Sequence, residues 1–355
     1  MTTYLSEKIK IISFMLILLV VQLHAYNLDL LFGKNAIILN KGFNWIFQNF
    51  FSNGITRIAV PLFFIISGYL FYLQFQPTLE NYLDKLKKRF KTLLLPYLIW
   101  SIFGVFFYFL LQSIPQSQSF FSNGLIKNYS LNDFFERIFL TPVPYQFWFL
   151  RDLMLFVIIS PIFYFFIKKL GALLIIILLV TWFINFDFII ISNEAILFFV
   201  CGAYLSISND DLINYEFSKK TYYLICSWIV AVVIKTSLEL INFKPLFAIN
   251  IFLKASILLG ILAIWSLYDA LKKSNQNKIF FKKSIVETSF FIFALHEPLL
   301  TIVKKVCFFM IGKENNKPLI VYIISPIITI IICITVGLIL KKYLNKFYSI
   351  LTGGR

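Results

Sequence analysis

Apolar runs long enough to cross a membrane recur from one end of the chain to the other, and they limit the possible folds most strongly. Of the 355 residues, 59% are hydrophobic and 14% are charged. An ordinary soluble domain has roughly 45–50% apolar residues and could not bury so much apolar surface. A helix crosses the hydrocarbon core of a bilayer with about 20 residues. We therefore expect an all-α, polytopic membrane protein that forms a single domain over residues 1–355.

Ten transmembrane helices can be placed on these runs. They lie near residues 9–28, 56–75, 92–112, 147–167, 170–187, 192–207, 221–240, 246–268, 287–310 and 318–340. Because little chain remains outside them, no loop is long enough to form a separate catalytic domain. Any chemistry is therefore expected within the helix bundle. The net charge of +16 is scattered among short loops, which argues against nucleic acid as a partner.

The basic residues indicate on which side of the membrane the chain ends lie, because Lys and Arg accumulate in cytoplasmic loops. If both termini are cytoplasmic, most basic residues fall on that side. One region disagrees, since this orientation places four lysines in an external loop: Lys304, Lys305, Lys313 and Lys317. The prediction is a multi-pass protein of the inner (plasma) membrane with both termini in the cytoplasm.

The chain has only two histidines, His24 and His296, and both fall inside predicted spans. A charge at the centre of a membrane helix costs about 2.5–3.5 kcal/mol, so ionisable residues there tend to mark function. A buried histidine can also simply hydrogen-bond between helices. An imidazole can accept a hydroxyl proton near pH 7, which makes His24 a candidate general base. No metal site is expected, because the four cysteines are widely separated.

The predicted topology places further polar residues in the same leaflet as His24. Span 2 begins at Arg57, and span 4 enters from the same side with the run Tyr145-Gln146-Phe147-Trp148-Phe149-Leu150-Arg151-Asp152. Each of these polar residues also has a simpler structural explanation. Arg57 could be an interfacial anchor, and Arg151 could only form an ion pair with Asp152 at a helix start. The pair Ser67-Gly68 could only permit close helix packing.

Five motifs, taken together and in this order, resemble the membrane-bound acyltransferase 3 family. They are Arg57-x-x-x-Pro-x-Phe-Phe-x-x-Ser-Gly-Tyr69, Lys88-Arg89 followed by Pro96-Tyr97, the Trp148–Arg151 run, Phe199-x-x-Gly202, and Phe291-x-x-x-Leu295-His296. The resemblance covers about residues 5–340 and is to members without an appended extracytoplasmic hydrolase-like domain. Bacterial members of that family O-acylate surface glycans and other acceptors.

The resemblance implies roles for particular residues. His24 would be the catalytic base, and Arg57 would stabilise the developing oxyanion or hold a phosphate of the donor. Arg89 would bind the phosphorylated end of coenzyme A. Lys10 and Lys91 would be donor-binding residues that replace two missing family arginines as point charges, or else the donor is bound differently. The sequence departs from the family at two positions. Ser13 stands where many relatives have an arginine before the histidine, and Thr92 stands where the second arginine of the pair is expected.

The acyl donor would be acetyl-CoA or another acyl-CoA, used as a substrate and not as a permanently bound cofactor. The acceptor would be a carbohydrate or glycolipid, and membrane lipid would be the remaining partner. Acceptor-binding or supporting roles are expected for Trp148, Arg151, Tyr69, His296 and Glu297. The simpler explanation for His296-Glu297-Pro298 is helix packing with a proline kink.

A second function remains open beside the O-acyltransferase, namely a non-catalytic glycan exporter or flippase. Such a protein would also use aromatic surfaces and intramembrane charges. An exporter requires a continuous polar path with several charges near the middle of the membrane. The predicted spans 170–187, 192–207, 221–240 and 318–340 contain few charges, which favours the enzyme.

Overall fold

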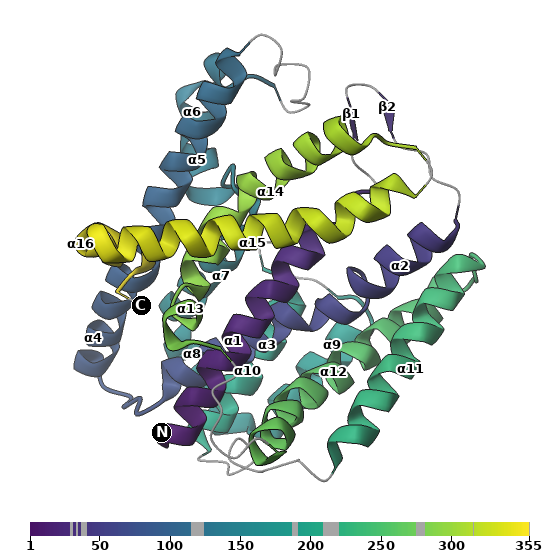
Figure 1. Ribbon diagram of the computed structural model, residues 1–355. Helices are drawn as coiled ribbons and strands as arrows, with labels where there is room; N and C mark the ends of the chain where they lie inside the picture. Colours follow the sequence, from purple (N-terminus) through teal and green to yellow (C-terminus); the bar gives the residue numbers. More distant parts are fainter. Residues whose placement is uncertain are drawn as a thin grey trace. The chain divides into compact units, whose positions relative to one another are not determined.

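The computed structural model describes residues 1–28, 31–32, 35–36, 41–114, 124–186, 191–208, 220–274, 281–314 and 316–354, and these are predominantly helical (Figure 1). The longest helices are α1 (Thr3–His24), α5 (Leu95–Ser113), α11 (Thr221–Leu240), α12 (Leu246–Ser274), α14 (Ser289–Ile311) and α15 (Lys317–Tyr343). Helices of intermediate length are α3 (Ala59–Tyr72), α4 (Leu79–Arg89), α7 (Trp148–Ile158), α8 (Ser160–Leu170), α9 (Ala172–Phe183) and α10 (Asn193–Ile207). The short helices are α2 (Phe43–Phe51), α6 (Leu131–Phe135), α13 (Lys283–Val286) and α16 (Asn345–Thr352). Two short strands, β1 (Leu31–Phe32) and β2 (Asn35–Ala36), pair antiparallel.

The predicted helical class is confirmed, and the chain is a multi-pass membrane protein. Within the described ranges, five helical segments are long and apolar enough to cross a membrane: Phe43–Tyr72, Leu79–Ser113, Thr221–Leu240, Leu246–Ser274 and Lys317–Tyr343. A sixth crossing is possible if α7 and α8 count as one span, although the two helices are bent by 67°. Ten spans, and cytoplasmic termini, remain predictions.

The predicted span 147–167 is therefore not one straight helix. The chain breaks at Ile159, and Pro161 follows in the first turn of α8. Proline has no backbone N–H and its ring clashes with the preceding turn, so a helix cannot run straight through it. Helices α9 and α10 are also shorter than a full span, with 12 and 15 residues. At 1.5 Å per residue they extend only about 18 and 22 Å, against about 30 Å of hydrocarbon. Asp187, the end of the predicted fifth span, lies outside the described residues.

Helices α1 and α14 are long enough to cross a membrane, but every stretch of 18 residues within either helix contains three charged residues. α1 contains Glu7, Lys8 and Lys10, and α14 contains Glu297, Lys304 and Lys305. The prediction that Lys304 and Lys305 lie in an external loop is wrong, because α14 continues to Ile311. The helix ends only at Gly312, whose φ of 95° lies in the left-handed region that favours glycine.

The chain divides into two compact units, each assembled from three separate stretches. The first unit contains Met1–Leu23, Ile46–Lys85 and Phe156–Val286. The second contains His24–Trp45, Leu86–Leu155 and Glu287–Arg355. His24, the last residue of α1, therefore belongs to the second unit together with α5, α14 and α15.

Helices α3 and α10 of the first unit approach so closely that only glycine fits at their crossing. A Cβ atom on Gly68 would overlap the carbonyl oxygen of Phe199, and one on Gly202 would overlap that of Ile65. Small residues allow such close contact between membrane helices. Two of the five motifs thus contain a glycine that this helix contact requires.

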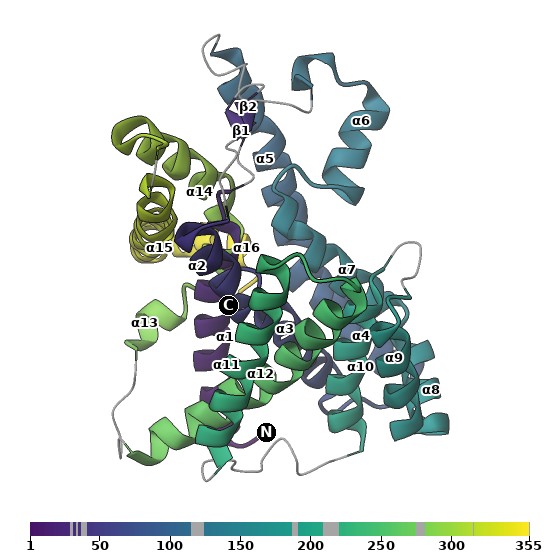
Figure 2. The ribbon, with the colours of Figure 1, turned by 90° about the vertical axis from the view of Figure 1, so that its right-hand side faces the viewer.

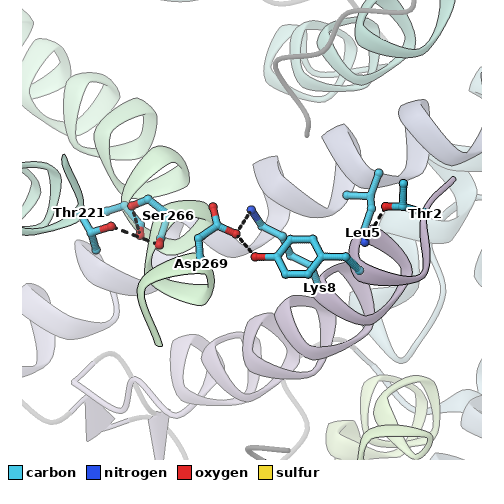
Figure 3. Close-up of polar contacts among 8 residues, drawn as sticks. Thr2, Leu5, Lys8, Thr221, Ser266 and Asp269 are labelled. Atoms are coloured by element: carbon cyan, nitrogen blue, oxygen red, sulfur yellow. Dashed lines mark hydrogen bonds and ion pairs between the residues drawn. The ribbon is translucent and has the colours of Figure 1, made fainter. Parts of the chain in front are cut away.

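In the same unit, α1 and α12 are joined by polar contacts, of which the Lys8–Asp269 pair is buried (Figure 3). Lys8 Nζ lies 2.6 Å from Asp269 Oδ1, and the Tyr4 hydroxyl donates to the same oxygen at 2.6 Å. A second ion pair, between Glu7 and Lys272, has a distance of 3.1 Å. Tyr4, Glu7 and Lys8 are spaced to occupy one face of α1, so a single helical face makes all three contacts. Figure 2 shows α11 lying beside α12 in this unit.

In the second unit, α14 packs along α15, the light green and yellow helices of Figure 1. Their contact is apolar, with Val303, Cys307, Phe308 and Val321 buried together. The chain end returns to α5 through α16, where Trp100 Nε1 donates to the carbonyl of Leu351 at 3.0 Å. This packing fixes α14, which carries most of the polar residues described next.

Candidate active site

His24 lies at the centre of a polar cluster in the second unit. Its ring is half-buried, and its Nδ1 is 2.9 Å from the Tyr145 hydroxyl. The His296 ring is stacked beside it, with 5.5 Å between the ring centroids and 22° between the planes. Lys304 Nζ donates to the backbone carbonyl of His24 at 2.8 Å. Both histidines of the chain thus share one site.

Lys304 is placed where the end of α1 needs a donor. The last carbonyls of a helix have no partner within it, and a positive charge there complements the helix dipole. Lys304 is buried, with 5% of its surface exposed. Its ammonium group therefore satisfies the carbonyl of His24 and also places a positive charge beside the imidazole.

His296 is fully buried and is held by its own helix. Its Nδ1 lies 2.8 Å from the carbonyl oxygen of Phe293 and 3.1 Å from that of Ile292. Because carbonyl oxygens only accept hydrogen bonds, Nδ1 must carry the hydrogen. The other nitrogen, Nε2, is buried and has no hydrogen-bond partner in the described part of the chain. In the neutral ring, this nitrogen is an unused acceptor inside the protein.

Helix α14 is interrupted directly after His296. Glu297 has non-helical φ and ψ angles of −112° and 129°, and Pro298 follows. Pro298 has no N–H to donate to the carbonyl of Ala294, four residues earlier. The side chain of Gln146 replaces it, donating to Ala294 O at 3.3 Å and to Glu297 O at 3.0 Å. The predicted proline kink is therefore present, and a residue from another segment completes its hydrogen bonds.

At the kink, the buried side chain of Glu297 reaches this cluster. One carboxyl oxygen, Oε2, accepts a hydrogen bond of 2.8 Å from Thr301. The other, Oε1, is buried without a hydrogen-bond partner among the residues described. The carboxyl group interacts electrostatically with Lys304 and with the Tyr145 hydroxyl. A buried charge needs such partners, because removal from water is costly.

The structure therefore brings together three of the predicted site residues, His24, His296 and Glu297. Sequence reasoning placed Tyr145 and Gln146 in the run that opens the predicted fourth span but gave them no role in the site. It also missed Lys304, which follows His296 by eight residues. That spacing is close to two helical turns and could have placed both side chains on one face of the helix.

Two other predicted residues of the second unit have local roles. Arg151 donates through Nε and Nη2 to Asp152 Oδ1 at 2.9 and 2.8 Å, and through Nη1 to the carbonyl of Leu140 at 2.8 Å. The ion pair considered as the simpler explanation is thus present. Trp148 is half-buried at the start of α7, edge-on to the ring of Phe149 at 6.3 Å.

The predicted donor-binding residues of this unit lie where α4 gives way to a π-helical turn, Phe90–Leu94. Arg89 is half-buried and Lys91 is exposed. Thr92, at the position of the missing second arginine, lies against the chain end, because a Cβ atom on Gly353 would overlap the Thr92 carbonyl. The φ of 66° at Gly353 also favours glycine there.

The remaining predicted residues belong to the first unit. Arg57 lies in a short 3-10 turn, Ile55–Ile58, with a half-buried side chain. Buried Lys235 of α11 lies near it and donates to the carbonyl of Asn53 at 3.1 Å. Tyr69 is buried next to the crossing of α3 and α10, and Lys10 is exposed. Across the described ranges, no three His, Cys, Asp or Glu side chains gather as a metal site would require.

The fold and this cluster define a multi-pass membrane protein with a polar site that contains both histidines of the chain. Residues 9–338 match the acyltransferase 3 family, whose members carry an acyltransferase domain, and the chain belongs to this family. It is therefore an acyltransferase, as the five motifs indicated.

One relative gives more detail. The succinoglycan biosynthesis protein ExoH of Rhizobium meliloti (strain 1021) is 27% identical over 315 residues. The matched region covers 86% of this chain and 81% of that protein. No solved structure matches this chain.

Proposed function

We propose that this protein transfers an acyl group, most simply acetyl, from cytoplasmic acyl-CoA to a hydroxyl of a surface glycan or glycolipid. It acts in the inner membrane with His24 as the general base. Family membership supports the reaction class, and the name of the succinoglycan relative supports a glycan acceptor. The observation that carries the proposal is the convergence of both histidines with Tyr145 and Lys304 in a largely apolar chain.

In the proposed reaction, the acceptor hydroxyl oxygen forms a bond to the thioester carbonyl carbon, and its proton passes to the His24 imidazole. The tetrahedral intermediate then collapses with cleavage of the carbon–sulfur bond. The proton moves from the imidazolium to the departing thiolate, which leaves as coenzyme A. A general base in such a step contributes about 10²–10⁴-fold to the rate.

Charge on the tetrahedral intermediate requires a cation or a hydrogen-bond donor nearby. We propose that Arg57 supplies this positive charge. The alternative role for Arg57 is to bind a phosphate of the donor. Arg89, with Lys91 and Lys10, would bind the anionic nucleotide end of the donor, for which a guanidinium group is well suited. No cofactor would remain bound between turnovers.

The acceptor would be held by aromatic and polar residues. We propose Trp148 and Tyr69 for this role, because aromatic rings offer flat faces with a polar edge that suit sugar rings. Arg151 would support this region through its pair with Asp152. His296 and Glu297, both buried, would support this region, His296 through its stacked ring and Glu297 through its interaction with Tyr145.

The test is transfer of radiolabelled acetyl-CoA to glycan in membranes from producing cells, comparing wild type with His24→Ala. Lys168→Ala, an exposed change near the end of α8, is the control. We expect His24→Ala to lower labelling at least about 100-fold, as expected for loss of a general base, while protein abundance and the control variant are unaffected. Undiminished labelling by a folded His24→Ala protein would exclude His24 as the base. Absence of labelling by the wild type with every acyl-CoA tested would exclude this class of donor.

A further inference from the structure

We propose that Tyr145 is a positioning residue for acyl transfer, linking the Glu297 carboxyl to Nδ1 of His24 and so presenting Nε2 of His24 to the acceptor hydroxyl. This inference rests on the proposed function of His24. No motif in the sequence gave Tyr145 a role.

The direction of the hydrogen bond between Tyr145 and His24 follows from what surrounds it. A phenol hydroxyl can donate or accept, and a neutral imidazole has one nitrogen of each kind. The hydroxyl also interacts with the Glu297 carboxyl, whose Oε1 has no other hydrogen-bond partner within the described residues. A negative carboxylate attracts the hydroxyl proton toward itself. The Tyr145 oxygen then accepts from Nδ1, and the lone pair of His24 lies on Nε2.

Burial does not explain the position of Tyr145. Its side chain is 46% exposed, whereas the neighbouring residues Gln146 and Phe147 are almost completely buried. The ring meets that of His24 edge-on, with 4.9 Å between centroids and 83° between planes. An exposed tyrosine adds little to packing, so its hydroxyl is the part that this position uses.

The segment around Tyr145 is fixed on both sides. Pro144 packs against α5 so tightly that a Cβ atom on Gly104 would overlap its ring. Gln146 donates to the two carbonyls at the kink of α14, one of which belongs to Glu297 itself. Tyr145 is thus held at a fixed distance from the residue whose carboxyl it contacts, and this preorganisation is what an orienting group requires.

During transfer, the acceptor proton binds Nε2 and the ring becomes an imidazolium. Its Nδ1–H then donates to the Tyr145 oxygen, while the hydroxyl proton remains directed at Glu297. A base oriented by a third group is the general arrangement for activating a nucleophile. Tyr145 keeps its proton and the Glu297 carboxylate stays ionised throughout, and the transferred proton leaves on the sulfur of coenzyme A.

The test is Tyr145→Phe, which removes only the hydroxyl. Tyr348→Phe is the matched control, because its hydroxyl donates to the backbone carbonyl of Glu287 in the same unit and does not contact His24. Kinetics of acetyl-CoA consumption are measured in detergent with purified full-length protein and a glycan acceptor. We expect kcat of Tyr145→Phe to fall about 10–100-fold, as for groups that orient a reacting side chain, with an unchanged KM for acetyl-CoA. Tyr348→Phe keeps the wild-type kcat.

A double-mutant cycle separates positioning from a structural effect. If Tyr145 acts through Glu297, then Tyr145→Phe combined with Glu297→Gln is no slower than the slower single variant. Multiplied effects in the double variant, or a wild-type kcat for Tyr145→Phe, would overturn the inference. If His24→Ala retains activity, the proposed function itself fails. If His24→Ala is inactive and Tyr145→Phe is normal, only the role of Tyr145 fails.

Discussion

The imidazole rings of His24 and His296 lie face to face, with centroids 5.5 Å apart and planes within 22° of parallel. The two rings have different surroundings. His24 is half-buried and hydrogen-bonded to the Tyr145 hydroxyl, whereas His296 is fully buried and hydrogen-bonded to backbone carbonyls of its own helix. Only His24 is therefore open to a substrate from outside the protein, and His296 supports it from below the surface.

This difference predicts unequal effects of removing the two rings. His24→Ala should lower acylation at least about 100-fold, because the base is lost. His296→Ala should lower it less, since the base remains but loses its stacked neighbour. Acylation is measured on glycan isolated from cells, and export of the polymer is measured in parallel. Export should continue in both variants. Loss of export with acylation intact in His24→Ala would instead indicate a transporter.

The buried pair of Lys8 and Asp269 predicts a test of stability. The pair is 2.6 Å apart, and Lys8 Nζ also lies 4.3 Å from the ring centroid of Trp265. Lys8→Met leaves a buried carboxylate without its cation, which costs about 3–5 kcal/mol. We expect a clearly lower thermal unfolding midpoint in detergent. Lys8→Met combined with Asp269→Leu should recover most of the loss. Equal midpoints for wild type and Lys8→Met would show that the pair does not hold α1 to α12.

The contact of α3 with α10 predicts a strong effect at Gly68. A valine there would overlap the backbone of α10, which cannot give way as a side chain can. Overpacking costs typically about 1–3 kcal/mol, and we expect Gly68→Val at the upper end of this range or beyond. Ser67→Ala, the neighbouring change, should be nearly neutral. The yield of folded protein after detergent extraction checks this, and similar yields for the two variants would contradict the close helix contact.

The kink of α14 predicts that Gln146 is required for stability. Gln146→Leu removes the donor to the carbonyls of Ala294 and Glu297 but keeps a similar volume. An unsatisfied buried carbonyl costs about 1–3 kcal/mol. The variant should unfold at a lower temperature and also lose activity, because Tyr145 precedes Gln146. An unchanged unfolding temperature would mean that water or another group satisfies these carbonyls.

Helix positions could be predicted from the sequence because long apolar runs leave a membrane chain few alternatives. The predicted span 221–240 coincides with α11, and the predicted span 192–207 nearly coincides with α10. The break at Ile159 was missed because hydropathy does not register a bend, although Pro161 gives the local reason. The length of α9 was overestimated because apolar residues continue in the sequence beyond the end of the helix at Phe183.

The site was predicted only in part. His24 and His296 stood out because they are the only histidines and lie in apolar runs, but nothing in the sequence predicts that their rings stack. Gln146 is an ordinary polar residue until the kink at Glu297 leaves a carbonyl without a donor. Such a role depends on two segments meeting in three dimensions, which motif spacing does not report.

Mass spectrometry of surface polysaccharide tests the central claim most directly. Polysaccharide is isolated from cells that produce the wild-type protein, the His24→Ala variant or neither, and the masses of the repeating units are compared. If His24 is the base of an acyltransferase, the repeating unit is heavier by one acyl group only with the wild type, and this mass difference also identifies the acyl group. Identical masses in all three samples, or an acyl group still present with His24→Ala, would contradict it.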